Sequence, residues 1–302
     1  MHREKIHWFR LAFQYKGSVV PAIYNRVLYC GLFGVFISVL HYFRFPVVQP
    51  ILGNVIPSIV LGLLLVFRTN TAYDRFWEGR KCWGSLINNV RNLARQIWIN
   101  IEEREPKDIT NKIINMRLLV AFAVATKLHL RGESVNKELE ALMSSYKYFT
   151  LKTMHNPPLE VAFWIGDYLQ QQYRCDRLNI YQLNAMQELL NKMVNDLGVC
   201  ERILKTPIPL AYSIHLKQLL LIYCLLLPFQ LVNNLGWWTG AIVALISFTL
   251  LGIEEIGIQI ENPFGYDSND LPLDAICQTM LLNIEDLASL TPSVSNYNQE
   301  FK

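Results

Sequence analysis

The 302-residue chain has few charged residues: Asp, Glu, Lys and Arg make up 18% of it, while 52% is apolar. An average soluble domain carries about 25% charged residues. Intrinsic disorder is excluded, because the chain has ample apolar surface to bury. The net charge of +3 is too small and too evenly spread to favour binding of nucleic acid. The six cysteines include no CxxC pair, and the six histidines do not cluster with them. Neither a disulfide framework nor a zinc site is therefore expected.

Motifs of the common enzyme classes are also absent. The patterns GxGxxG, GxxxxGKS, GxxxxGKT, HExxH and GxSxG do not occur. The densest group of carboxylates is Glu102, Glu103 and Glu105, which is typical of a solvated helix face. No histidine lies at a recognised spacing from a nucleophile. The sequence therefore predicts a protein that is not an enzyme.

What the chain does have is four long uncharged apolar runs, at residues 27–43, 51–67, 218–232 and 236–253. A membrane-spanning helix needs about 17–25 such residues. The third run reaches that length if it begins further back and Lys217 extends toward water. Four uncharged runs in two close pairs are hard to bury in the core of a soluble protein. We therefore predict transmembrane helices at about 27–44, 51–67, 212–232 and 236–253.

Charge at the ends of these runs predicts their orientation. Basic residues precede the first and third runs and follow the second, whereas the two short connections carry only Arg44. By the positive-inside rule, both termini and the middle of the chain lie in the cytoplasm. An integral protein of the cell (inner or plasma) membrane is expected.

This orientation divides the chain into three parts. Residues 1–80 form an interfacial segment and the first transmembrane hairpin. Residues 81–205, where apolar residues recur at helical spacing, form a cytoplasmic domain of amphipathic helices. Residues 206–302 form the second transmembrane hairpin and a cytoplasmic C-terminal segment.

One apolar stripe in the second run is a candidate for a pore lining. Val55, Ile59, Leu63 and Phe67 are four residues apart and share one face of a helix. The stripe could face lipid or pack against another helix, and on spacing alone this alternative is the commoner one. It could also line a hydrophobic constriction, which closes when water leaves it.

Three longer motifs, taken together, resemble one family. They are FRTNTAYDRFWEGRKCWG (67–84), CERILKTPIPLAYSIH (200–215) and ENPFGYDSNDLPLDAIC (261–277). With the opening HWFRLAFQYKGSV (7–19), they are similar to bestrophin ion channels of the bacterial and cyanobacterial branch. The resemblance covers nearly the whole chain. It implies an all-α subunit with four transmembrane helices and a cytoplasmic helical domain, assembled as a homopentamer around one central pore.

The resemblance also implies which residues narrow the pore. The hydrophobic neck of the family corresponds to Ile59, Leu63 and Phe67. A second narrowing, the cytoplasmic aperture, corresponds to Tyr181 or to the adjacent Ile180.

A calcium clasp of the animal members has matching positions in this chain. They are Gln259, Asn262, Asp267 and Asp270, although the long acidic run of those members is reduced here to YDSND. Two Asp three residues apart beside a glycine turn, with free carbonyl groups, can bind a hard cation. The alternative is a turn in which Asp270 or Ser268 caps the next segment.

The resemblance implies an ion channel for small monovalent anions such as chloride. No cofactor is required, with calcium as the candidate ligand, and the partners are the lipid bilayer, the permeant ions and other copies of the chain. A monovalent cation channel of the same fold is the alternative, because a neck of Ile, Leu and Phe carries no charge. A non-conducting membrane scaffold is a further one. A secondary transporter is disfavoured, because the apolar runs contain no charged residue and no obvious inverted repeat.

Overall fold

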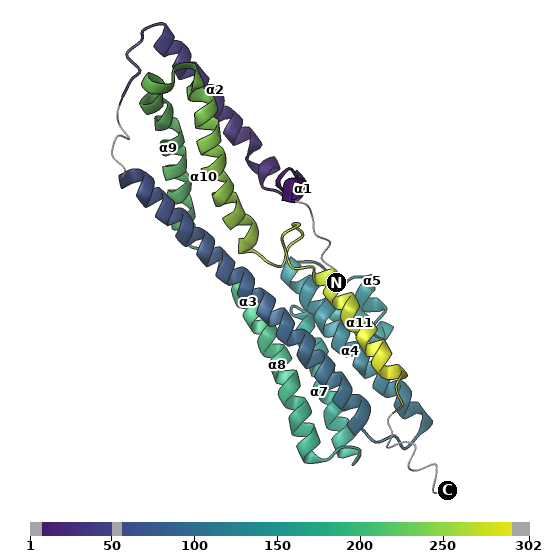
Figure 1. Cartoon of the computed structure of the whole chain (residues 1–302). Helices are drawn as coiled ribbons and strands as arrows, with labels where there is room; N and C mark the ends of the chain where they lie inside the picture. The colour runs from purple at the N-terminus through teal and green to yellow at the C-terminus, as the bar shows by residue number, and fades with distance from the viewer. Residues whose placement is uncertain (1–7, 50–55, 292–302) are drawn as a thin grey trace. The chain divides into compact units, whose positions relative to one another are not determined.

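The computed structural model describes residues 8–49 and 56–291, and within these ranges helices are the regular elements that it contains. The chain divides into two compact units. Unit 1 comprises residues 1–77 and 207–270, and unit 2 comprises residues 78–206 and 271–302. Helix α3 (Ile56–Asn100) begins in unit 1 and ends in unit 2 (Figure 1).

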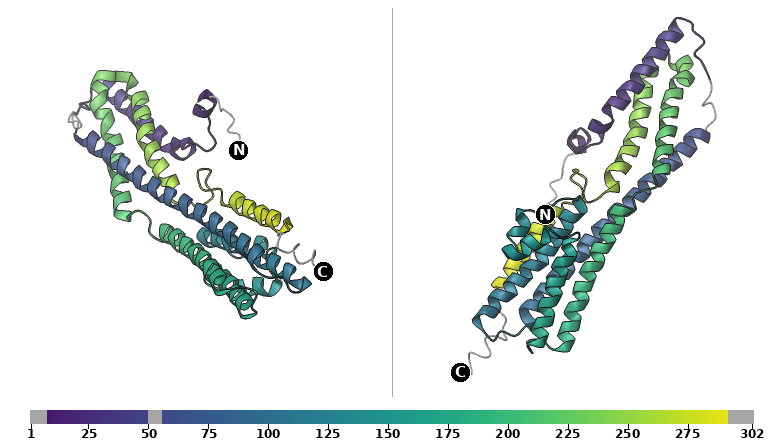
Figure 2. Two further views of the ribbon diagram at one scale, coloured as in Figure 1. Left: turned by 60° about the horizontal axis from the view of Figure 1, so that its bottom comes forward. Right: turned by 180° about the vertical axis from the view of Figure 1, so that it is seen from behind.

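Unit 1 is built from long apolar helices joined by short connections. With the first part of α3, its elements are α1 (Trp8–Ala12), α2 (Val20–Tyr42), α9 (Leu210–Leu235), the 3-10 turn η1 (Gly236–Trp238) and α10 (Thr239–Glu261). Helices α2, α9 and α10 pack on one another, and the ribbons run side by side in the views of Figures 1 and 2. Pro228 lies inside α9, which a membrane helix tolerates because neighbouring groups satisfy the freed carbonyl.

Four stretches of the described residues are long and apolar enough to cross a membrane: Val20–Tyr42, Ile56–Asn100, Pro106–Arg131 and Leu210–Glu261. The last contains both α9 and α10. The third is α4, and 72% of its most apolar window is buried inside the protein, against 22–28% in the other three. Because the apolar surface of α4 is covered by its own chain, the membrane helices are α2, the first part of α3, α9 and α10.

The helices run beyond the predicted spans at several ends. Span 27–44 corresponds to α2, which starts earlier, at Val20, and ends at Tyr42. Span 236–253 corresponds to η1 and α10, and α10 continues to Glu261. The largest difference between prediction and structure is at the second span. It was predicted to end at residue 67, whereas α3 continues without a break to Asn100. Charged residues end an apolar run but not a helix, since Arg, Lys and Glu are good helix formers. Residues 51–55, at the start of that span, lie outside the described residues.

Helices α2 and α10 approach each other most closely at glycines. A Cβ on Gly34 would lie 2.9 Å from the Cα of Gly240, and one on Gly240 would lie 3.0 Å from the carbonyl oxygen of Gly31. Ser38 lies on the same side of α2 and donates its hydroxyl to the carbonyl of Gly236, at 3.0 Å. Small residues of this kind let membrane helices pack through their backbones, where lipid supplies no hydrophobic force between them.

Unit 2 surrounds one buried helix. Its elements, with the second part of α3, are α4 (Pro106–Arg131), α5 (Lys137–Glu140), α6 (Ser145–Leu151), α7 (Pro157–Arg174), α8 (Ile180–Lys205) and α11 (Leu273–Ser289). Helix α4 packs on α7 and α11, and residues 118–125 are all buried. It begins at a capping box of Glu105 and Asp108 and ends at Gly132, whose φ of 67° suits a helix C-cap.

A buried lysine joins three of these helices. Lys127 of α4 is 1% exposed, and its ammonium contacts Asp274 of α11 at 2.8 Å and Glu138 of α5 at 2.6 Å. Burial by itself lowers the pKa of Lys127, but the two carboxylates raise it by more, so the ammonium stays charged. The C-terminal helix is thereby held against the core of unit 2.

We predict that Gly240→Ala lowers the free energy of unfolding by about 1–3 kcal/mol, because the added methyl group has no space between α2 and α10. The measurement is the melting temperature of the protein in mild detergent. Gly198→Ala in α8 is the matched control, since a Cβ there meets no atom within 4 Å. An unchanged melting temperature for Gly240→Ala would contradict the close packing.

Candidate functional site

The predicted neck residues lie on one uncovered face of α3. Ile59, Leu63 and Phe67 have exposed fractions of 55%, 52% and 62%. They follow one another at intervals of four residues, so their side chains form one row along the helix. Three large apolar side chains thus stand in a row that the rest of the described chain leaves open.

The opposite face of α3 packs on α9. Leu61 and Leu65 are almost fully buried and form one cluster with Leu216 and Leu220 of α9. Tyr212 of α9 also donates its hydroxyl to the carbonyl of Leu64, at 2.7 Å. At 3.6 residues per turn, the buried leucines lie on nearly the opposite side of α3 from the neck residues. Packing within unit 1 therefore fixes α3 through one face and directs the neck row away from the unit.

An ion pair anchors α3 directly after Phe67. Arg68 is 4% exposed, and its Nη2 lies 2.6 Å from Oε2 of Glu261, the last residue of α10. Glu261 also accepts the backbone N–H of Ile208 at Oε1, at 2.9 Å, just before α9 begins. Its carbonyl accepts Nε of Arg75 at 3.2 Å. One carboxylate therefore joins α3, α10 and the segment that leads into α9.

No local pattern in the sequence predicts this pairing. Arg68 is in the motif that follows the second apolar run, and Glu261 opens the motif ENPFG. The two residues are 193 positions apart, so no local spacing relates them. The only signal in the sequence was an acidic residue after an apolar run, because the other apolar runs are flanked mainly by basic residues.

The four calcium-clasp positions lie at the end of α10 and in the turn that follows. The Asp270 carboxylate accepts the N–H of Asp267 at 2.8 Å, and Asp267 accepts the N–H of Asp270 at its carbonyl, at 3.0 Å. Gln259 Oε1 accepts Nδ2 of Asn269 at 2.8 Å, and Asn262 Oδ1 accepts the N–H of Phe264. Side chains of the clasp are thus used in the hydrogen bonds of a turn. In the described ranges no group of three His, Cys, Asp or Glu is placed to hold a metal ion.

Tyr181 and Ile180, the predicted aperture residues, form the first turn of α8 in unit 2. Their exposed fractions are 83% and 44%. A capping box of Asn179 and Gln182 fixes the start of the helix: the Asn179 side chain accepts the N–H of Gln182 at 2.9 Å, and the reverse bond is 3.0 Å. Arg95 of α3 lines a groove of about 430 Å³ beside Tyr181. A large aromatic side chain is therefore presented to solvent next to a cation.

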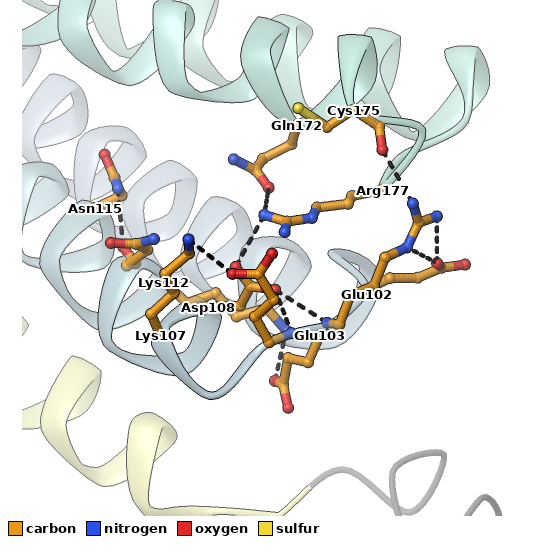
Figure 3. Close-up of polar contacts among 12 residues, drawn as sticks. Glu102, Glu103, Lys107, Asp108, Lys112, Asn115, Gln172, Cys175 and Arg177 are labelled. Carbon is orange, nitrogen blue, oxygen red and sulfur yellow. Dashed lines mark hydrogen bonds and ion pairs between the residues drawn. The ribbon is translucent and has the colours of Figure 1, made fainter.

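The segment before α8 is held by a polar cluster (Figure 3). Arg177 binds the Asp108 carboxylate at 2.9 Å, and the carbonyl of Arg177 accepts the N–H of Glu102 at 3.2 Å. The same carboxylate accepts the N–H groups of Arg104 and Glu105, at 3.0 and 2.9 Å. Burial raises the pKa of Asp108, but these N–H groups and the Arg177 guanidinium lower it by more. The ionised carboxylate therefore joins the start of α4 to the segment that places Tyr181.

The comparisons with known proteins identify one family. The model of the bacterial/fungal bestrophin family matches residues 1–286. The chain is 70% identical to the voltage-dependent anion channel-forming protein alr2987 of Nostoc, with 97% of this chain and 96% of that protein covered. It is 55% identical to the voltage-dependent anion channel-forming protein sll1024 of Synechocystis, with 94% and 93% covered.

A solved structure agrees with these relatives. The crystal structure of a bacterial bestrophin homologue from Klebsiella pneumoniae matches this chain with a TM-score of 0.81 and 29% identity. The match covers 89% of this chain and 100% of that chain. The similarity therefore extends over nearly all of the described fold.

We predict that Glu261→Gln lowers the free energy of unfolding by about 3 kcal/mol, because it leaves the buried Arg68 charge without its partner. The double variant with Arg68→Gln is expected to lose less than the sum of the two single losses, since the pair is coupled. Melting temperatures of the four proteins measure this coupling.

The control for these four proteins is Glu102→Gln, which removes the carboxylate of an exposed ion pair with Arg104. It is expected to cost less than about 1 kcal/mol. Equal losses at Glu102 and Glu261 would contradict the special role of the buried pair.

Calcium binding stays a prediction, and two variants separate it from the turn. A calcium ion in hundredfold excess over its Kd would add about 2.7 kcal/mol of stability, and Asp267→Asn would abolish that gain. Asp270→Ala removes the carboxylate that accepts the Asp267 N–H, so it destabilises the turn in calcium and in chelator alike. Identical melting curves of the parent protein in calcium and in chelator would show that this segment is a turn that does not bind calcium.

Proposed function

The chain belongs to the bestrophin family, and on that premise we propose that it conducts small monovalent anions, such as chloride, through the central pore of a homopentamer. It is an integral membrane protein and a channel, not an enzyme. The relatives that are 70% and 55% identical over nearly their whole length bear the name of anion channel-forming proteins. Identity at this level over full length supports the same ion class for this chain.

The observation that carries the pore assignment is the uncovered row of Ile59, Leu63 and Phe67 on α3. Unit 1 buries the opposite face of this helix and leaves the row exposed, at 52–62% per residue. One chain cannot enclose a pore with a single helix face. In a ring of five copies, the three residues would form three stacked apolar rings around the axis.

The neck would then act as a gate. Water in a narrow apolar tube is poorly hydrogen-bonded and tends to leave, and an ion does not follow without its hydration shell. Rings of Ile, Leu and Phe carry no charge, so they cannot select ions by sign. The positive edges of the Phe67 rings can face an anion, and charged groups near the aperture, such as Arg95 beside Tyr181, can attract one.

The orientation in the membrane follows from the charged ends of the helices in unit 1. Arg26 of α2 pairs with Glu254 of α10 at 3.8 Å, and Arg68 of α3 pairs with Glu261 of α10. The opposite ends of these helices carry little charge, apart from Arg44. The positive-inside rule then places the charged ends, and with them both termini, on the cytoplasmic side of the cell membrane.

The test of this function is a measurement of mass and of current. The purified protein in mild detergent is expected to have the mass of a pentamer. In planar bilayers with asymmetric NaCl and then KCl, the reversal potential is expected to move toward that of chloride. A shift toward the cation potential would establish the cation channel instead. A monomer or dimer, or a pentamer without conductance, would contradict the channel.

We predict that replacing Ile59, Leu63 and Phe67 together with Ala increases the current and weakens gating, because a wider tube keeps its water. Ion selectivity is expected to change little in this variant and to respond instead to Tyr181→Ala or Ile180→Ala. The measurement is the single-channel current and reversal potential of each variant.

The control for the neck is the pair Leu245→Ala and Phe248→Ala on α10, which also removes exposed apolar side chains from a membrane helix. These changes are expected to leave the current unchanged. Because each side chain of the neck row is more than half exposed in the single chain, the triple variant should still fold and assemble. An unchanged conductance from a folded pentamer would show that the row faces lipid.

A further inference from the structure

Unit 1 contains an apolar groove with basic residues at one end, between α2, α9 and α10. It has a volume of about 530 Å³, within the range of ligand-binding cavities. Its floor includes Leu220 and Cys224, which are 1% and 2% exposed. Its rim includes Tyr29 and Leu221, which are 69% and 58% exposed. The groove is therefore open to whatever surrounds these membrane helices.

We propose that this groove binds an anionic phospholipid, with the phosphate at Arg26 and Lys217 and an acyl chain along the apolar floor. Both cations line the groove, and neither is buried: Arg26 is 53% exposed, and Lys217 is exposed as well. They stand at the ends of α2 and α9 where the charged residues of unit 1 begin. A lipid has the same order of parts, with a charged head at the membrane surface and a chain beneath it.

Two carboxylates near the groove support the assignment of the phosphate site, because both are buried beside Arg26. Glu254 also lines the groove, but its side chain is only 3% exposed and lies 3.8 Å from Nη1 of Arg26. Glu255, 11% exposed, lies 3.5 Å from the same nitrogen. These buried carboxylates hold the Arg26 side chain in place, and the accessible charges at the groove are positive. Each basic residue near a membrane surface adds to the attraction for anionic lipid.

The occupant is a lipid rather than a soluble anion because the apolar part of the groove extends away from the cations. Residues from Arg26 to Phe33 of α2 and from Lys217 to Leu225 of α9 line it, which is about two turns of each helix. A free phosphate would use only the charged end. A second copy of the chain would have to cover the exposed ammonium of Lys217, and taking that charge out of water is costly.

The test is native mass spectrometry of the intact assembly, titrated with phosphatidylglycerol or with phosphatidylcholine of the same acyl chains. Phosphatidylglycerol is expected to bind more tightly. Lys217→Gln should weaken its binding about fivefold and leave phosphatidylcholine unaffected. Leu221→Trp, which fills the rim, should weaken both lipids. Lys16→Gln is the matched control, because Lys16 is exposed near the start of α2 and lies outside the groove.

A second readout uses the cysteines of the chain. Cys30 lines the groove, and Cys175 is exposed in unit 2. Phosphatidylglycerol is expected to slow alkylation of Cys30 and to leave Cys175 unchanged. Three results would overturn the proposal: equal binding of the two lipids, an equal loss in Lys16→Gln and Lys217→Gln, or a Cys30 rate that lipid does not change. Loss of the assembly in Leu221→Trp would show instead that a second copy covers the groove.

Discussion

The ion pair between Arg68 and Glu261 is the contact on which the arrangement of unit 1 depends. It connects the end of the apolar part of α3 to the last residue of α10, and the same carboxylate binds the backbone just before α9. A buried arginine without its partner would carry a large desolvation cost, so the pair has one well-defined arrangement. Because Arg68 follows Phe67 directly, the contact that joins α3 to α10 and to the segment before α9 also anchors the helix next to the row of Ile59, Leu63 and Phe67.

The two faces of α3 differ in how far the chain covers them. Leu61 and Leu65 are buried against α9, while the neck row on the other side remains 52–62% exposed. Large exposed apolar surfaces of this kind mark contact with a membrane or with other protein copies. The helix is therefore fixed to its own unit through one face and leaves the other uncovered.

The sequence predicted the class of fold well, because long uncharged runs have one main explanation. The four membrane helices and a helical domain besides them were confirmed. The extension of α3 to Asn100 was not predicted, since the charged residues after Phe67 end the apolar run without ending the helix. Amphipathic helices were predicted for residues 81–205, whereas residues 118–125 of α4 are apolar at every position and all buried.

The sequence by itself determined the membrane character, the family motifs and the spacing of Ile59, Leu63 and Phe67, all of which depend on residue type and local periodicity. Only the tertiary structure decided which face of α3 is covered, that Glu261 pairs with Arg68 across 193 positions, and that Asp270 is bonded within its own turn. It also placed Arg26 and Lys217 at the end of one groove. The Asp270 turn is local, and the sequence left it open beside a calcium site. The other contacts join distant segments and arise from helix packing, which local patterns do not encode.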